Sequence, residues 1–383
     1  MSPNQQQQLY TFQDAWTAWR SGAKFPIAFF GDSTFDGAAT TGWVRNTLGA
    51  DNVSPNAFSR KLEGLLREAA GQSVLRIYNA GFSGQTAAWG AAHIEQEFTG
   101  DSPYRDVKMI GIGFGINDRL GYPSEMEYRV GLRTHTIRMI EWCYEHGIQP
   151  FLLTTQAVVA PGVHTTYEGT YPMRTGGHIH TVAGEVKKEL ALEYGLPLID
   201  LNAYTEAFLL YSSYSTASII PDRLHFGDLG HAFVAELLFA HLVPYTIVAD
   251  GYTKIDYSTQ AVQDGVPEDW LTMSDSPVDG FKVLVDRERE ETADRKVMTV
   301  WLFAAARRPL ALRAYKSGTT GSGAASSGEE QEGFTGTYVK VNGKAHLLTG
   351  PETELGRMEQ GLYRLEVFTG TGTRVDFKGF WLD

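Results

Sequence analysis

Short apolar runs alternate with longer stretches of helical periodicity through about the first 245 residues. The apolar runs predict buried strands at 24–30, 74–79, 107–114, 151–155 and 196–201. The periodic stretches predict helices at 55–70, 123–146, 179–194 and 232–242, and Gly147 and Gly195 stand where two of them should end. Strands that alternate with helices indicate a parallel sheet covered on both faces.

Five such strands favour an α/β, flavodoxin-like, three-layer sandwich with its site at the carboxyl ends of the strands. Within the helix at 123–146, the spacing predicts one apolar face formed by Met126, Val130, Ile137 and Ile140. Cys143 follows three residues after Ile140, so we expect a buried core thiol there rather than a nucleophile.

The pattern changes near residue 249, where helical periodicity fades and Gly, Thr, Asp and Pro become more frequent. Strands are predicted at 297–303, 337–341, 362–368 and 374–381, with a Gly- and Ser-rich loop at 317–336. We therefore expect two domains, 1–248 and 249–383, of which the second is a small all-β, β-sandwich-like module.

Charge, cysteine content and hydropathy limit the classes of partner and the cellular compartment that we expect for this protein. The 383 residues carry a formal net charge of -12, which disfavours nucleic acid and anionic membranes as partners. Cys143 is the only cysteine, so no intramolecular disulfide can form. Residues 1–10 are polar and unlike a signal peptide, and no apolar run could span a bilayer. We expect a soluble cytoplasmic protein, although a processed secreted form would look the same; homo-oligomerisation stays open.

A serine follows the first predicted strand directly, in the motif Gly31-Asp32-Ser33. A sharp strand-to-helix turn holds such a serine exposed, close to the amides of a helix N-terminus. The tripeptide alone is weak evidence, because residues 100–102 repeat it in front of a proline, where a plain turn is the better interpretation. Asp32 itself is expected to be structural.

Three further signals follow later strands. The turn at 79–84 contains Gly81, either a plain turn glycine or a backbone N–H donor for an oxyanion. Asn117 follows the third strand, either as a capping residue or as a second donor. Asp222 and His225 precede the last helix, and their spacing lets the carboxylate orient the imidazole, although an Asp near a His is more often a surface turn.

As a set, Gly31-Asp32-Ser33, Gly81, Asn117 and Asp222-x-x-His225 stand in the order of the four sequence blocks of SGNH (GDSL-type) hydrolases. About the first 245 residues resemble that family, and the β-rich remainder lies outside the resemblance. The resemblance implies an α/β sheet sandwich and ester hydrolysis without metal or cofactor.

The resemblance also implies a role for each matched residue. Ser33 would be the nucleophile, His225 the general base and acid, and Asp222 the group that orients His225. The N–H groups of Ser33 and Gly81, with the Asn117 side chain, would form the oxyanion hole.

Other signals are weaker. The run Gly111-x-Gly113-x-Gly115 lacks the full dinucleotide pattern, so no cofactor is expected. No metal site is expected either, because the loop histidines at 164, 178 and 180 have no Cys or carboxylate pattern beside them.

The long loop at 161–177 follows the fourth strand, where loops often line a site. Its substrate-contact candidates are Tyr167, Tyr171 and Arg174.

Nothing in the chain resembles a lipid lid, and a β-module beside an esterase domain is often carbohydrate-binding by fold analogy. The favoured function is therefore a serine esterase that removes short acyl groups, acetyl above all, from carbohydrates. The alternatives are a lipase or thioesterase, or a non-catalytic carbohydrate-binding or phage-tail-like protein with a vestigial hydrolase domain.

Overall fold

The computed structural model divides the chain into two compact units, residues 1–242 and 243–383. It describes residues 8–52, 54–155, 181–205, 214–222, 224–243, 245–248, 253–254, 271–272, 282–283, 295–304, 310–316, 336–358, 361–369 and 377–382. The boundary at 242/243 lies six residues before the predicted boundary at 248/249. The reason is that strand β6 (Tyr245–Val248) pairs with β10 (Arg295–Ala304) of the second unit.

A five-stranded sheet forms the centre of the first unit, and all its neighbouring strands are parallel. Its strands are β1 (Ile27–Gly31), β2 (Ile77–Gly81), β3 (Met109–Ile112), β4 (Gln149–Leu153) and β5 (Leu198–Ile199). The order β2-β1-β3-β4-β5 is the flavodoxin-like order, so the predicted fold is confirmed. The order reverses between β1 and β3, and sheets of this kind bind ligands at the carboxyl ends of the strands on either side of such a reversal.

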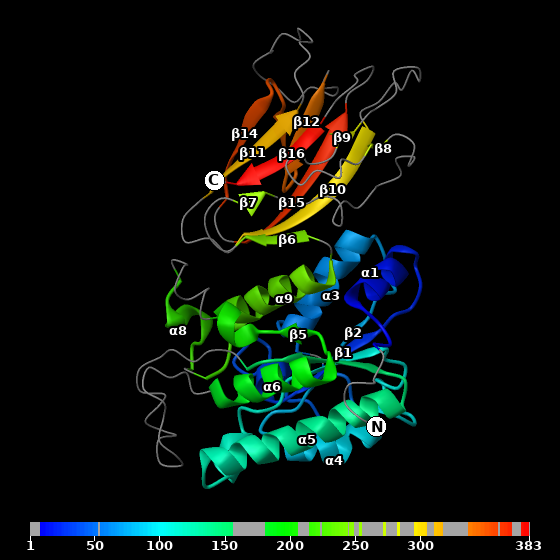
Figure 1. Ribbon diagram of the computed structural model, residues 1–383, viewed down its shortest axis with the longest axis vertical. Helices are drawn as coiled ribbons and strands as arrows, with labels where there is room; N and C mark the ends of the chain where they lie inside the picture. Colours follow the sequence, from blue (N-terminus) through cyan, green and yellow to red (C-terminus); the bar gives the residue numbers. More distant parts are fainter. Residues whose placement is uncertain are drawn as a thin grey trace. The chain divides into compact units, whose positions relative to one another are not determined.

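Helices cover both faces of this sheet (Figure 1). One layer contains α4 (Ala87–Phe98), α5 (Glu125–Glu145) and α6 (Thr181–Tyr194); the other contains α1 (Phe12–Arg20), α3 (Phe58–Ala70) and α9 (Asp228–Leu242). Successive β1 side chains point to opposite layers, as strand geometry requires. The ring of Phe29 packs 5.1 Å from that of Phe58 on α3, whereas Phe30 packs 4.8 Å from Phe114 on the other side.

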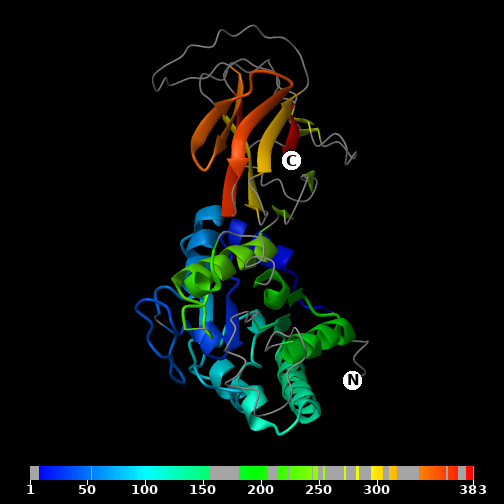
Figure 2. The same cartoon turned by 90° about the vertical axis from the view of Figure 1, so that its left-hand side faces the viewer.

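Helix α5 buries only part of the predicted face: Ile140 is buried and Ile137 is partly buried against the core, but Met126 and Val130 are not. Met126 and Val130 are 75% and 60% exposed, and the residues buried on the helix are Tyr128, Leu132, Thr136, Met139, Ile140 and Cys143. Both faces carry apolar residues at helical spacing, and packing against α4 and α6 selects the second. Figure 2 shows α5 beside α6. Cys143 is buried, as expected.

The glycine run in and after β3 provides space for aromatic rings rather than for a cofactor. A Cβ at Gly111 would lie 2.6 Å from the Phe151 ring, and one at Gly113 would lie 2.0 Å from the Phe35 ring. Each glycine therefore admits a ring that any larger side chain would displace.

The second unit is built from antiparallel strands, apart from the parallel pair β10–β6. One sheet has the order β13-β12-β15-β10-β6, a second has β14-β11-β16-β7, and β8 pairs with β9. The remaining bounds are β7 (Thr253–Lys254), β8 (Leu271–Thr272), β9 (Lys282–Val283), β11 (Leu310–Lys316), β12 (Thr337–Val341), β13 (Lys344–Leu347), β14 (Glu352–Met358), β15 (Gly361–Thr369) and β16 (Phe377–Leu382). The predicted all-β character is confirmed; residues 317–335 of the predicted loop lie outside the described residues.

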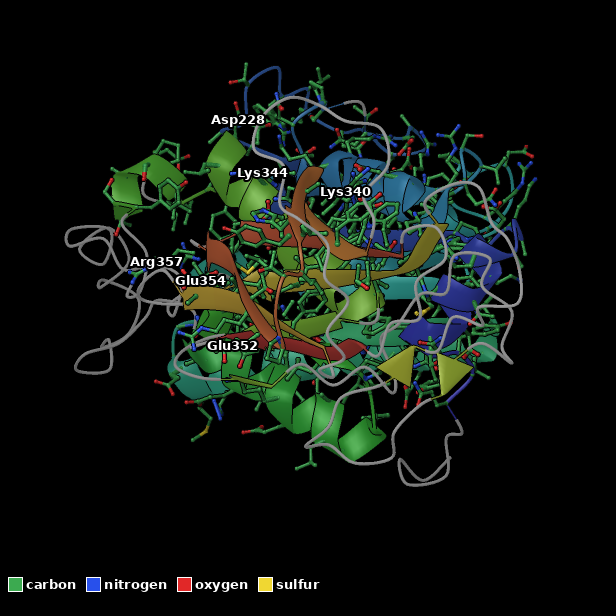
Figure 3. The ribbon with its side chains drawn as sticks, turned by 90° about the horizontal axis from the view of Figure 1, so that it is seen from above. Asp228, Lys340, Lys344, Glu352, Glu354 and Arg357 are labelled. Atoms are coloured by element: carbon green, nitrogen blue, oxygen red, sulfur yellow. The ribbon has the colours of Figure 1, made fainter. Side chains whose placement is uncertain are left out.

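Charged side chains line the edge strands of this unit. Glu352, Glu354 and Arg357 are exposed on β14, an edge strand of its sheet (Figure 3). Lys344 is exposed on β13, the edge of the other sheet. Charges on edge strands oppose pairing with a strand of another molecule.

Candidate active site

Ser33 begins α2 (Ser33–Asp36), the single helical turn that follows β1. Asp32 is the N-cap: its Oδ1 accepts hydrogen bonds from the Thr34 N–H at 3.0 Å and the Thr34 hydroxyl at 2.9 Å. Gly37 ends the turn with φ +90°, a conformation that favours glycine. Ser33 therefore occupies the first helical position, where its N–H has no acceptor within the helix.

The structure brings Ser33, His225 and Asp222 together although they are far apart in the sequence. His225 Nε2 lies 2.9 Å from Ser33 Oγ, and His225 Nδ1 lies 2.6 Å from Asp222 Oδ2. One imidazole thus bridges a hydroxyl and a carboxylate, which is the geometry of an activated nucleophile.

Asp222 is held in place by the backbone of its own turn. Its Oδ1 accepts hydrogen bonds from the N–H groups of Leu224 at 2.9 Å and His225 at 2.6 Å. Burial alone would raise the pKa of Asp222, but these bonds and the His225 side chain outweigh it and lower that pKa. The carboxylate is therefore ionised at neutral pH and accepts the His225 Nδ1–H.

The structure does not direct the Gly81 N–H into the site, contrary to the prediction. That N–H donates to Asn79 Oδ1 at 2.9 Å. The glycine is needed for packing instead, because a Cβ there would lie 2.2 Å from the Asp36 backbone nitrogen in α2. Gly81 lets the nucleophile turn lie against β2.

Three residues further along the same turn, Gly84 has φ +84°, and its N–H donates to no group in the described part of the chain. Asn117 contacts this turn through Nδ2, which donates to the Gln85 carbonyl at 2.9 Å. Asn117 makes no side-chain cap bond to the short helix η2 (Asp118–Gly121) that follows it, so its amide is not used for capping. Gly84 was not among the predicted donors, although it is the second glycine of the turn at 79–84.

Two buried carboxylates lie behind these groups. Asp32 is fully buried, and burial raises its pKa. Asp118 is 1% exposed, and both its oxygens accept the Ala87 N–H at the start of α4. Burial raises the pKa of Asp118 to about 7, and the Asp32 charge contributes to this shift.

The other candidates do not join the site as the structure describes it. Tyr167, Tyr171 and Arg174 lie outside the described residues, as do the histidines at 164, 178 and 180. Ser102, in the repeated tripeptide, donates to the Glu97 carbonyl. His231 is buried on α9 and accepts the Phe58 N–H at 3.0 Å; burial lowers its pKa to about 3.

Two kinds of feature are missing from the described residues. They contain no group of three or more His, Cys, Asp or Glu side chains that could hold a metal ion. Their helices also include none with the length and apolar character needed to cross a membrane.

Comparisons with known proteins place this geometry in context. The family model described as GDSL-like lipase/acylhydrolase matches residues 29–233. No curated protein matches the chain.

Among solved structures, an acetyl xylan esterase is similar at 18% identity and TM-score 0.43, over 57% of this chain and 100% of its own. An acetylxylan esterase catalytic mutant from Geobacillus stearothermophilus has 19% identity and TM-score 0.42, over 57% and 94%. A two-domain esterase active on acetylated mannans has 16% identity and TM-score 0.41, over 97% and 94%.

Proposed function

The chain belongs to the GDSL-like lipase/acylhydrolase family, which makes it a carboxylic ester hydrolase, and we propose that it releases short acyl groups from carbohydrates through an acyl-enzyme on Ser33. The observation that carries this proposal is the pair of hydrogen bonds made by His225, 2.9 Å to Ser33 Oγ and 2.6 Å to Asp222 Oδ2. A serine hydroxyl becomes a nucleophile when an adjacent base can accept its proton.

In the proposed mechanism, His225 Nε2 takes the Ser33 proton as Oγ attacks the ester carbonyl. Asp222 keeps the proton on Nδ1 and stabilises the imidazolium that forms. His225 then protonates the leaving alcohol, and the acyl group stays on Ser33. A water molecule, deprotonated by His225, then attacks the acyl carbonyl. The bond to Ser33 Oγ breaks, Oγ takes the proton from His225, and the acid is released.

The developing oxyanion requires donors that are not already used. We propose the N–H groups of Ser33 and Gly84 and the second N–H of the Asn117 amide, whose other N–H donates to the Gln85 carbonyl. Gly84 takes the place that the sequence suggested for Gly81. The contact of Asn117 with Gln85 supports this choice, because it keeps the amide beside the Gly84 turn.

An exposed aromatic side chain bonded to α2, the helical turn that begins with Ser33, supports a carbohydrate as the alcohol part. Trp43 is 38% exposed, and its indole bonds to Asp36 in α2. Its loop is held on both sides: the Thr41 N–H donates to Asp228 Oδ1 at 2.8 Å, and Arg45 Nη2 donates to the Ser83 carbonyl at 3.0 Å. A fixed, half-exposed indole offers an apolar face on which a sugar ring can stack.

The acyl-length preference tests the proposal directly. We expect p-nitrophenyl acetate to have a kcat/KM at least about tenfold above that of the octanoate, because a pocket shaped for a short acyl group excludes longer ones. A serine-directed phosphonate should add one adduct, at Ser33, as measured by peptide mass spectrometry. Equal or better hydrolysis of octanoate would favour a lipase, and absence of both hydrolysis and adduct would favour a non-catalytic protein.

Replacing Trp43 with alanine tests whether this side chain binds the sugar of a carbohydrate ester. We expect KM for acetylated xylo- or manno-oligosaccharides to rise about tenfold, the loss of one aromatic contact. Hydrolysis of p-nitrophenyl acetate should stay within about twofold, since that ester carries no sugar. The matched control is Val44→Ala, which shortens the exposed neighbouring side chain. An equal effect on both substrates would contradict a role for Trp43 in sugar binding.

A further inference from the structure

Helix α6 contains a lysine that is completely buried and has no hydrogen-bond partner among the described residues. Lys187 is 0% exposed, and its Nζ makes no hydrogen bond. The next residue, Lys188, is exposed and pairs with Asp200 at 2.6 Å. Burying an ammonium is costly, so a lysine in this position requires a compensating negative environment.

The position of α6 indicates the direction of the Lys187 side chain. A Cβ at Gly115, just beyond β3, would lie 3.1 Å from the Ala183 Cβ. Ala183 is one helical turn before Lys187 and shares its face. Because side chains lean toward the N-terminus of their helix, we expect the long Lys187 side chain to extend toward Gly115 and the carboxyl edge of the sheet.

Two buried carboxylates flank the same edge. Asp32 Oδ2 has no hydrogen-bond partner in the described part of the chain, although Oδ1 caps α2 through Thr34. Asp118 follows Asn117 directly, and it interacts with Asp32 and with Lys187. Burial lowers the pKa of Lys187 to about 8, while the charges of Asp32 and Asp118 act in the opposite direction. The buried Lys187 cation thus interacts electrostatically with two buried carboxylates, one after β1 and one after β3.

We propose that Lys187 is a positioning residue, whose buried charge opposes the protonation of Asp32 and thereby stabilises the turn that aims Ser33. The inference rests on the proposed esterase function. Asp32 links the Lys187 charge to the position of Ser33, because its carboxylate accepts both hydrogen bonds from Thr34 at the N-terminus of α2. The lysine was detectable in the sequence as a charge within the apolar stripe of Ala183, Leu190 and Tyr194.

The charged groups that act on Asp32 come from three elements. They are Lys187 on α6, Asp118 after β3 and His225 before α9. Burial raises the pKa of Asp32, and Lys187 opposes this rise. Without the lysine charge, Asp32 should take up a proton at a higher pH and lose its ability to cap α2 as a carboxylate.

The test compares Lys187→Met with Lys188→Met, which makes the same change on the exposed side of α6. With p-nitrophenyl acetate, we expect Lys187→Met to lower kcat by about 10- to 100-fold, since small misplacement of a nucleophile is costly, with KM within about twofold. The acidic limb of its kcat/KM profile should move to higher pH. Lys188→Met should match the wild type in both respects.

A loss of kcat in Lys187→Met without a shift of the acidic limb would overturn the proposal, as would unchanged kinetics. If Lys187→Met does not fold, Asp32→Asn is compared with Asp32→Asn/Lys187→Met. We expect these two to be equally active, because a neutral amide in place of the Asp32 carboxylate needs no cation, and a much lower activity of the double variant would overturn the proposal. Failure of the esterase function itself is distinguishable, because the wild type would then cleave no ester.

Discussion

Replacement of Ser33 by alanine is expected to lower kcat for p-nitrophenyl acetate by about a millionfold, the loss typical of a removed serine nucleophile. Ser33 Oγ is the only atom of that side chain bonded to His225 Nε2, so its removal leaves the base without a nucleophile to activate. The variant should still hydrolyse the ester faster than the uncatalysed reaction in water, because the oxyanion donors remain. Initial rates and phosphonate labelling measure the loss.

The chain contains a matched control for this change. Ser102→Ala alters the serine of the second Gly-Asp-Ser tripeptide, whose hydroxyl donates to the Glu97 carbonyl rather than to His225. We expect Ser102→Ala to retain the wild-type kcat. If Ser33→Ala kept more than about one per cent of the wild-type rate, the acyl-enzyme on Ser33 would be excluded.

Replacement of Asp222 by asparagine is expected to lower kcat by about 10⁴-fold, with little change in KM. Asparagine has nearly the same shape, and its carbonyl oxygen can still accept the backbone bonds from Leu224 and His225. Its amide group, however, would face His225 Nδ1 as a donor and favour the tautomer that carries its proton on Nε2. His225 could then no longer accept the Ser33 proton.

Asp228→Asn is the control for the asparagine substitution. Asp228, labelled in Figure 3, lies three residues after His225 at the start of α9, and its Oδ1 accepts the Thr41 N–H at 2.8 Å. We expect this variant to hydrolyse p-nitrophenyl acetate within a few-fold of the wild type. A loss in Asp228→Asn as large as in Asp222→Asn would indicate a general disturbance of the loop rather than a role in proton transfer.

Much of the catalytic unit could be predicted because its signals are local. Apolar runs and glycine stops depend on nearest neighbours along the chain, so they predicted the five strands of the sheet and the fold. Parallel strands place their carboxyl ends at one edge, so residues after successive strands were expected to meet there. Ser33 and His225 do so.

Prediction was less successful where the local sequence allowed two arrangements equally well. Apolar residues recur on two faces of α5, and only the neighbouring helices decide that Tyr128 is buried and Met126 exposed. In the turn at 79–84, either Gly81 or Gly84 could have directed its N–H toward an oxyanion. The Asn79 side chain accepts the hydrogen bond from the Gly81 N–H, and the sequence pattern does not reveal that bond.

The sequence by itself thus determined the order of strands and helices, the chemical types at the site and the change to an all-β second unit. The tertiary structure alone decided which N–H of the turn at 79–84 has no partner among the described residues, and which apolar residues of α5 are buried. It also decided that Lys187 shares a buried environment with Asp32 and Asp118. The reason is physical: propensity and periodicity act over a few residues, whereas hydrogen-bond direction, burial and charge pairing depend on segments that only folding brings together.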